Sequence, residues 1–334
     1  MRWALIGSST IAAQYMIPAF RAQVGGEVVR VVSGSAERGT AYAAEHSIPA
    51  FGTSLDEALG DENVDAVYIS TTNEKHFPQA MAAIAAGKHV LCEKPLAMTL
   101  DDAVAMVHAA EEAGVVFATN HHLRCSGSHR AVRGLIEAGR VGRVLSLRIF
   151  HAVHLPSNLQ GWRINAAEAG GGVIPDITVH DADVTRFLLG EDPETVVAQM
   201  AASGMGQGVE DSAMSVWTMP SGAMVMSHES FTHPFAGSGL EVHGTEGSIF
   251  ARGVMTQRPV GEIELVTGTG REAVPFPDHD LYVQGVRQFV DTVAGTGQPA
   301  ATGWDGVKSL AVALAVREAA QSGIRQQVNY GGAK

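Results

Sequence analysis

The sequence has little cysteine, little lysine and no long apolar run, and each shortage excludes a class of protein. Cys92 and Cys125 are the only cysteines among 334 residues, too few for a disulfide framework or for a cysteine-rich zinc site. No apolar stretch approaches the roughly 18 residues that a membrane-spanning helix needs. The 23 basic residues, of which only five are lysine, form no run or stripe, and the net charge is −12. We therefore expect neither a membrane nor a nucleic acid as partner.

The N-terminal stretch is not expected to be a secretion signal. Only four apolar residues separate Arg2 from Gly7, too few for the core of a signal peptide. Together with the two thiols, this predicts a reduced, cytoplasmic location. The length and a hydrophobic content of 46% predict two domains, each with its own core, and a small molecule as the partner.

The first third of the chain alternates short apolar runs with amphipathic stretches. Runs rich in Val and Ile, typical of strands buried on both faces, occupy residues 3–6, 28–32, 64–70, 89–92 and 115–119. The stretch 99–114 between two of them begins with a Thr cap and acidic residues and closes on Gly114, as a helix does. This βαβ series predicts a parallel, doubly wound sheet.

After residue 122 the pattern changes. A helix is expected at 126–138 and a long alternating strand near 143–153. From residue 194 onward, strands are joined by turn signals such as MPSGAM at 219–224 and HGTEGS at 243–248, which favour antiparallel pairing. A last helix is expected at 304–323. The second part of the chain is therefore predicted to hold an open, mostly antiparallel sheet.

The stretch ALIGSSTIA at 4–12 raises the first functional question. Of the three glycines of a dinucleotide-binding G-x-G-x-x-G loop, only Gly7 is present, with Ser9 and Ala12 at the other two positions. Both are small, and the hydroxyl groups of this loop, with the amides of a helix N-terminus, can face a phosphate. The alternative is a plain strand-to-helix turn with a Ser or Thr cap.

The end of the second strand addresses the cofactor. Ser33 stands where an acidic residue would bind the ribose of NAD, and Arg38 follows one turn into the next helix. A guanidinium can grip the 2′-phosphate of NADP, and no carboxylate at position 33 repels it. We therefore predict NADP(H), against the alternative that Arg38 is a solvated helix residue paired with a nearby Glu.

Two further motifs carry candidate catalytic groups. In HVLCEKPLA at 89–97, Lys94 follows a buried strand and can polarise a carbonyl; Pro95 fixes the turn, and a surface lysine is the alternative. In AGGGVIPDITVHDAD at 169–183, Asp176 and His180 stand four apart on a predicted helix, so a carboxylate can orient a proton-exchanging imidazole. A helix cap and a structural histidine are the alternatives here. A metal site that includes Asp183 is less favoured, so we predict no metal.

Taken together, these motifs resemble the glucose-fructose oxidoreductase and inositol dehydrogenase (Gfo/Idh/MocA) family. CEKPLA and GGGVIPDITVHDAD are similar to its two signatures, and STTNEKHFPQAMAAIAAGKHVLCEKP to the block between the loop and the lysine. The resemblance implies a dinucleotide-binding Rossmann domain at 1–121, followed by a substrate-binding α/β domain at 122–334. It also implies that Lys94, Asp176 and His180 are the catalytic group.

Within the family, the sequence is most similar to a bacterial member that reduces a sugar ketone with NADPH. This resemblance implies a set of cofactor contacts: Gly7, Ser9, Thr10, Ile11, Ala12, Ser33, Gly34, Arg38, Thr71, Thr72, Asn73, Glu74, His76, Glu93, Lys94, Asn120, Trp162, Arg163 and Tyr282. It also implies reduction of a sugar ketone between the two domains, with His180 as the proton donor. The alternatives are an NAD(P)-dependent sugar or inositol dehydrogenase, a glycosidase that recycles bound NAD, and a non-catalytic NADP-sensing regulator.

Overall fold

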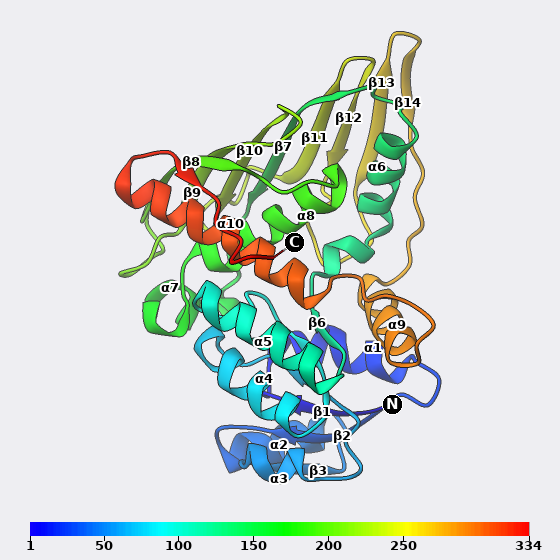
Figure 1. Cartoon of the computed structure of the whole chain (residues 1–334), viewed down its shortest axis with the longest axis vertical. Helices are drawn as coiled ribbons and strands as arrows, with labels where there is room; N and C mark the ends of the chain where they lie inside the picture. The colour runs from blue at the N-terminus through cyan, green and yellow to red at the C-terminus, as the bar shows by residue number, and fades with distance from the viewer. Residues whose placement is uncertain (334) are drawn as a thin grey trace. The chain divides into compact units, whose positions relative to one another are not determined.

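The computed structural model describes residues 1–333, which divide into two compact units (Figure 1). Unit 1 contains residues 1–122 and 282–307, and unit 2 contains residues 123–281 and the chain from residue 308 onward. The chain first passes from unit 1 to unit 2 after residue 122, one residue beyond the predicted boundary at 121/122. A single boundary is nevertheless incomplete, because residues 282–307 return to unit 1.

Unit 1 is built on a six-stranded sheet in the order β3-β2-β1-β4-β5-β6, with every pair parallel. The strands are β1 (Arg2–Ile6), β2 (Glu27–Val32), β3 (Ala50–Gly52), β4 (Ala66–Ile69), β5 (His89–Cys92) and β6 (Phe117–Thr119). Five of them match the predicted runs. The sequence did not indicate β3, because this edge strand has three residues and Phe51 at its centre is 44% exposed. The predicted parallel, doubly wound sheet is confirmed.

The helical segments of unit 1 connect these strands. They are the π-helical η1 (Ala12–Met16), α1 (Ile17–Arg21), α2 (Ala36–Glu45), α3 (Leu55–Leu59), the 3₁₀ segment η2 (Asn73–Lys75), α4 (His76–Ala85), α5 (Leu100–Ala113) and, from its second residue onward, α9 (Leu281–Val293). Helix α5 has the predicted ends: the Thr99 side chain accepts from the Asp102 amide at 3.2 Å, and Gly114 takes a left-handed conformation. Figure 1 shows α5 beside α4.

A buried aromatic cluster explains why α9 belongs to unit 1. Trp3 of β1 stacks on Phe20 of α1 with ring centroids 4.2 Å apart, and Phe289 of α9 lies 5.2 Å from Trp3. All three side chains are at most 1% exposed. Burying rings of this size stabilises the packing strongly, so this contact holds α9 on the sheet of unit 1.

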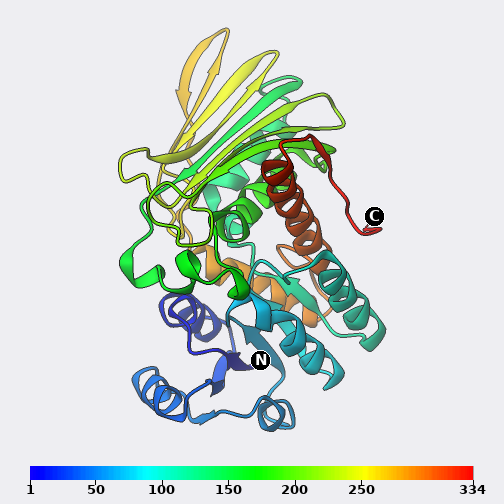
Figure 2. The ribbon, with the colours of Figure 1, turned by 90° about the vertical axis from the view of Figure 1, so that its left-hand side faces the viewer.

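Unit 2 contains a nine-stranded sheet in the order β14-β13-β12-β11-β7-β10-β9-β8-β15 (Figure 2). Only the β7–β10 pair is parallel, which confirms the predicted mostly antiparallel sheet. Its strands are β7 (Val144–Ala152), β8 (Thr195–Ala201), β9 (Ser212–Thr218), β10 (Met224–Ser230), β11 (Ser238–Gly244), β12 (Gly247–Arg252), β13 (Glu262–Thr267), β14 (Gly270–Ala273) and β15 (Gln326–Gln327).

One face of this sheet is covered by helices. The helical segments assigned wholly or partly to unit 2 are η3 (His122–Cys125), α6 (Gly127–Glu137), η4 (Ser157–Leu159), α7 (Trp162–Asn165), η5 (Ala167–Ala169), the π-helical η6 (Ile174–Thr178), α8 (Val179–Leu189) and α10 (Gly303–Ser322), which begins in unit 1. Helices α6 and α8 pack on each other, α8 against β7 and α6 against β12 and β13. Along β10, Val225, Ser227 and Glu229 are buried whereas Met224 and Met226 are exposed, so odd-numbered side chains of β10 face the helices. Within residues 1–333, no helix is long and apolar enough to cross a membrane.

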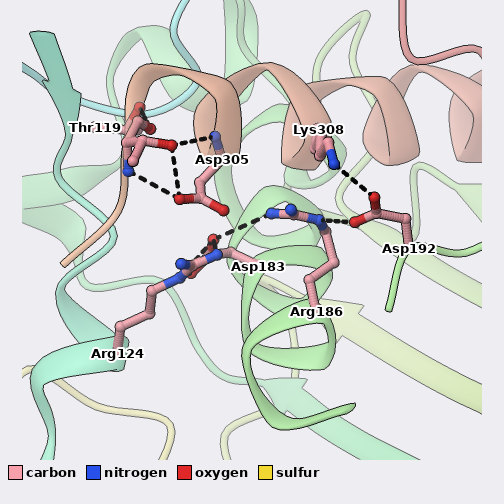
Figure 3. Close-up of polar contacts among 8 residues, drawn as sticks. Thr119, Arg124, Asp183, Arg186, Asp192, Asp305 and Lys308 are labelled. Carbon is pink, nitrogen blue, oxygen red and sulfur yellow. Dashed lines mark hydrogen bonds and ion pairs between the residues drawn. The ribbon is translucent and has the colours of Figure 1, made fainter. Parts of the chain in front are cut away.

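A network of ion pairs joins α8 to its neighbours in unit 2 (Figure 3). Asp183 of α8 is 1% exposed and accepts hydrogen bonds from Nε and Nη2 of Arg124 at 2.7–3.0 Å. It also lies 3.9 Å from Arg186. Asp192 binds Arg186 at 2.6 Å and Lys308 of α10 at 2.8 Å. Alternating charges therefore compensate one another at low exposure.

Replacing the central carboxylate tests this network. We expect Asp183→Asn to lower the free energy of unfolding by about 3 to 5 kcal/mol, because a buried guanidinium loses its charge partner. Glu137→Gln removes the exposed pair with Arg133 and should change stability by less than about 0.5 kcal/mol. Calorimetric unfolding of both variants provides the comparison, and equal stability of the two would contradict the assigned importance of the network.

Candidate functional site

In unit 1, the predicted cofactor residues gather where parallel strands end. Gly7 follows β1, Ser33 follows β2, Lys94 lies two residues after β5, and Asn120 follows β6. Because the strands are parallel, these positions share one edge of the sheet. The strand order reverses between β1 and β4, and the crevice at such a reversal is where ligands bind in open α/β sheets.

The loop after β1 is closely packed and braced by its own hydroxyl groups. Gly7 has a φ of +111°, and a Cβ on it would lie 3.1 Å from the Ser70 backbone, so glycine is required. The Ser9 hydroxyl donates to Ser70 Oγ at 2.7 Å and accepts from the Ala12 amide at 3.2 Å. Ser9 therefore caps the helix and braces the loop, and Ala12, fully buried, packs in the core. Thr10 is exposed and Ile11 half-buried.

The end of β2 presents a small cluster of hydroxyl groups beside a guanidinium. Ser33, 2% exposed, lies 3.1 Å from Ser8 Oγ and accepts from Arg38 Nε at 3.2 Å. The neighbouring Gly34 is exposed, and a Cβ on it would meet no atom within 4 Å. No acidic side chain occupies position 33, and Arg38 is exposed at the start of α2. The donor set suits a dianionic phosphate.

A buried histidine contacts the turn that carries Lys94. His76 is fully buried, with Nδ1 2.8 Å from the Pro95 carbonyl oxygen and Nε2 3.2 Å from that of Thr71. Burial lowers the pKa of this imidazole, so one nitrogen donates in the neutral ring. The His76 ring braces the Lys94–Pro95 turn, whose peptide bond is cis, and its contact with a cofactor stays a prediction.

Glu93, beside Lys94, is held in a hydrogen-bonded position. Its Oε1 accepts from Tyr68 Oη at 2.5 Å and from Asn120 Nδ2 at 2.6 Å. Burial raises the pKa of Glu93 although both of these hydrogen bonds favour the carboxylate. The fixed carboxyl group thereby links the ends of β5 and β6.

The other predicted cofactor contacts stay predictions, and the structure locates each. Thr71 donates to Gln79 Oε1 and Thr72 to Glu74 Oε1, both at 2.7 Å, and Asn73 is 4% exposed. Tyr282, 1% exposed, stacks between Tyr15 and His122, 4.8 and 4.9 Å away. Trp162 and Arg163 lie on α7 in unit 2.

In unit 2, the glycine run before Asp176 permits a close backbone approach. A Cβ on Gly172, whose φ is +116°, would lie 2.4 Å from Glu210 Oε1. Glu210 accepts from the amides of Val173, through its carbonyl at 3.0 Å, and Ile174, through its carboxyl at 3.2 Å. The sequence did not indicate a role for Glu210, since nothing in its neighbourhood resembles a motif. It anchors the start of η6.

Asp176 and His180 are brought onto one helical segment, as predicted, but its form differs. Asp176 lies within the π-helical η6 and His180 in the first turn of α8; π-helical turns are frequent at functional sites. Asp176 Oδ2 is 3.5 Å from Arg163 Nε, and the Arg163 guanidinium stacks over Trp162. His180 is 7% exposed. The sequence did not indicate that Arg163 is the ionic partner of Asp176.

The metal alternative finds no matching geometry in the described part of the chain. No group of three or more His, Cys, Asp or Glu side chains there is arranged to hold a metal ion. Asp183, weighed as a ligand, binds the Arg124 guanidinium instead.

A further histidine lies beside His180. The ring centroids of His151 and His180 are 6.2 Å apart, and His151 Nδ1 is 2.9 Å from Asp181 Oδ1. Sequence analysis missed both His151 and Asp181, because they come together only when β7 packs under α8.

Comparison with known proteins agrees with this geometry. Residues 1–121 match the oxidoreductase family with an NAD-binding Rossmann fold, and residues 129–250 match the GFO/IDH/MocA C-terminal domain. The chain is 55% identical to a 1,5-anhydro-D-fructose reductase from Ensifer adhaerens over 99% of both chains. It is 29% identical to a myo-inositol 2-dehydrogenase from Thermotoga maritima over 78% of this chain and 79% of that protein.

A solved structure gives the same result in three dimensions. The crystal structure of an aldose-aldose oxidoreductase from Caulobacter crescentus in complex with glycerol superposes with a TM-score of 0.88 at 26% identity, over 98% of this chain and 99% of that one. The Rossmann sheet, the mostly antiparallel second sheet and the matches along both parts of the chain lead to one conclusion. The chain belongs to the GFO/IDH/MocA family of oxidoreductases.

Proposed function

We propose that the chain reduces 1,5-anhydro-D-fructose to 1,5-anhydro-D-mannitol with NADPH. The observation that carries the substrate is the 55% identity, over 99% of both chains, with a 1,5-anhydro-D-fructose reductase. Lys94 lies in the motif CEKPLA, and Asp176 and His180 lie in GGGVIPDITVHDAD, the two motifs that are similar to the family signatures. NADPH, when bound, supplies the hydride for the substrate carbonyl carbon.

Each catalytic residue has one role in this proposal. The Lys94 ammonium polarises the substrate carbonyl and stabilises the charge that develops on its oxygen. The His180 imidazole gives that oxygen a proton. Asp176, itself held by Arg163 at 3.5 Å, orients His180 or the sugar. The His76 and Glu93 contacts support this assignment, because they fix the turn on which Lys94 stands.

The preference for NADPH is the second part of the proposal. Arg38 would bind the 2′-phosphate together with the hydroxyl of Ser33, whose Oγ is 3.2 Å from Arg38 Nε. Gly7 would let the pyrophosphate approach the backbone, and the amides that follow it would bind its oxygens. Neutral Ser33 leaves no carboxylate to repel the added phosphate.

One spectrophotometric assay tests the reaction. We expect NADPH oxidation with 1,5-anhydro-D-fructose at a kcat/KM above about 10⁴ M⁻¹s⁻¹, the lower end of the usual range, and much slower oxidation with other sugar ketones. Turnover without added cofactor would favour a cofactor-recycling glycosidase. NADPH binding without turnover on any sugar would favour a regulator, and oxidation of a sugar or inositol with NAD⁺ would favour a dehydrogenase.

Cofactor preference is tested at Arg38. A charge-assisted hydrogen bond contributes about 1.5 to 3 kcal/mol, so Arg38→Ala should lower kcat/KM with NADPH by roughly 10- to 100-fold and leave that with NADH nearly unchanged. Arg325→Ala, which removes an exposed arginine of unit 2, is the charge-matched control. An equal effect of Arg38→Ala on both cofactors would show that Arg38 does not read the 2′-phosphate.

The proton donor is tested at His180. His180→Ala should lower kcat by about 10² to 10⁴, the usual contribution of general acid catalysis. The dissociation constant of NADPH, measured by fluorescence titration, should stay nearly the same, because His180 serves the proton and not the cofactor. Full activity of this variant would exclude the role.

A further inference from the structure

A hydrogen-bonded chain of one imidazole, one hydroxyl and two carboxyl groups lies beside His180. His151 Nδ1 is 2.9 Å from Asp181 Oδ1, and Asp181 Oδ2 is 3.3 Å from the Ser227 hydroxyl. Ser227 Oγ also lies 2.5 Å from Glu229 Oε1. Both carboxyl groups are 0% exposed, whereas His151 retains 9% exposure. All of these residues belong to unit 2.

Strand pairing and helix packing bring these groups together. In the parallel pair of β7 and β10, His151 stands opposite Glu229. Both side chains face the side of the sheet that α8 covers, since alternate residues along each strand point to one face. Asp181, next to His180 on α8, contacts His151 and Ser227 and so joins the helix to the two strands. The arrangement is therefore fixed by three separate elements.

Two buried carboxyl groups this close cannot both carry a charge. Burial first, and then the charge of Asp181, raise the pKa of Glu229 well above its ordinary value. Glu229 is therefore the member of this pair that holds a proton near neutral pH. A carboxylate only accepts, so Nδ1 of His151 is the donor and its Nε2 is left on the side away from Asp181.

We propose that His151 returns a proton to His180 after each turnover, with Asp181 as the positioning residue. This inference rests on the proposed function, in which His180 gives its proton to the reduced carbonyl oxygen. His151 enters this step with protons on both ring nitrogens. The N–H bond at Nε2 breaks as an N–H bond forms on the His180 nitrogen that has lost its proton, no electrons are exchanged, and His151 is left neutral with its Nδ1 proton held by Asp181. Solvent then reprotonates His151 through its exposed edge.

The proposed transfer passes through one water. The two rings are tilted by 45° with centroids 6.2 Å apart, so they are neighbours without being stacked, and one water can mediate proton transfer between positioned groups. The titratable groups that face His151 are Asp181 and His180 from α8, Glu229 from β10 and His129 from α6. Burial, and then the charge of His151, lower the pKa of His129 to about 3, so His129 stays neutral. Ser238, opposite His151 on β11, carries no charge.

Rapid mixing of the complete protein with NADPH and 1,5-anhydro-D-fructose separates the first turnover from the later ones. In His151→Gln we expect the first turnover to be retained within about threefold and the steady-state kcat to fall by about 10-fold or more, since a lost proton-transfer group costs this much or more. Added imidazole should restore the later turnovers. Asp181→Asn should show the same pattern, and Glu229→Gln should stay near the wild type because an amide resembles the neutral acid. His108→Gln, an exposed histidine of α5, is the matched control.

Three outcomes would overturn the relay. These are equal loss of the first and later turnovers in His151→Gln without rescue by imidazole, unchanged steady-state turnover in that variant, or a loss in Glu229→Gln as large as in Asp181→Asn. Absence of NADPH oxidation by the wild type would instead contradict the proposed function, so the two failures are distinguishable.

A measurement on the wild-type protein without cofactor does not depend on whether the variants fold. The long-range ¹H–¹⁵N spectrum of the wild-type protein should show a proton on Nδ1 of His151, held by Asp181. A spectrum in which Nδ1 carries no proton would overturn the assigned orientation. If His151→Gln does not fold by circular dichroism, His151→Asn replaces it in the mixing experiment.

Discussion

Because every strand of the unit 1 sheet runs parallel to its neighbours, the segments that follow β1, β2, β4, β5 and β6 all leave at one edge. The positions of the proposed cofactor residues in unit 1 depend on this constraint. The chain need only supply a suitable residue after each strand: a glycine after β1, a serine after β2 and a lysine after β5. Helix positions then add Arg38 and the buried His76, which hold the edge in shape.

The positions of Asp176 and His180 in unit 2 depend on a different interaction, the close approach of backbone to a buried carboxyl group. Gly172 lies so near Glu210 that no side chain fits, and Glu210 in turn accepts from the start of η6. Desolvation raises the pKa of Glu210, and a buried polar group of this kind is stable only when it is hydrogen-bonded. The contact therefore fixes where the π-helical turn begins, and with it the positions of Asp176 and His180.

Unit 2 also shows how several buried charges can be accommodated under one helix. Helix α8 directs Asp183 toward Arg124, which compensates its charge directly. Two residues earlier, Asp181 accepts from His151 and lies in a chain with Glu229. Charge pairing serves the first carboxylate, and sharing of a proton serves the second pair, because two charges in one buried site are costly. One helix therefore carries a carboxylate that pairs with an arginine and a carboxylate that belongs to the proposed proton relay.

Local pattern made much of the fold predictable. Val- and Ile-rich runs, the Thr99 cap and Gly114 reflect short-range preferences, so five of the six parallel strands and α5 could be located from sequence. The turn signals at 219–224 and 243–248 likewise preceded β10 and joined β11 to β12. The edge strand β3 escaped because three half-exposed residues carry no periodic signal.

The sequence by itself determined the residue types at the strand ends and the pairing of Asp176 with His180 on one helical segment, since both depend on neighbours within a few positions. Tertiary structure alone decided that α9 packs on Trp3, that Ser9 braces its own loop and that His76 supports the Lys94 turn. It alone decided that His151, Asp181 and Glu229 meet beside His180. His76 and Pro95 are 19 positions apart and Trp3 and Phe289 are 286 apart, and no periodicity encodes a separation that only chain packing creates.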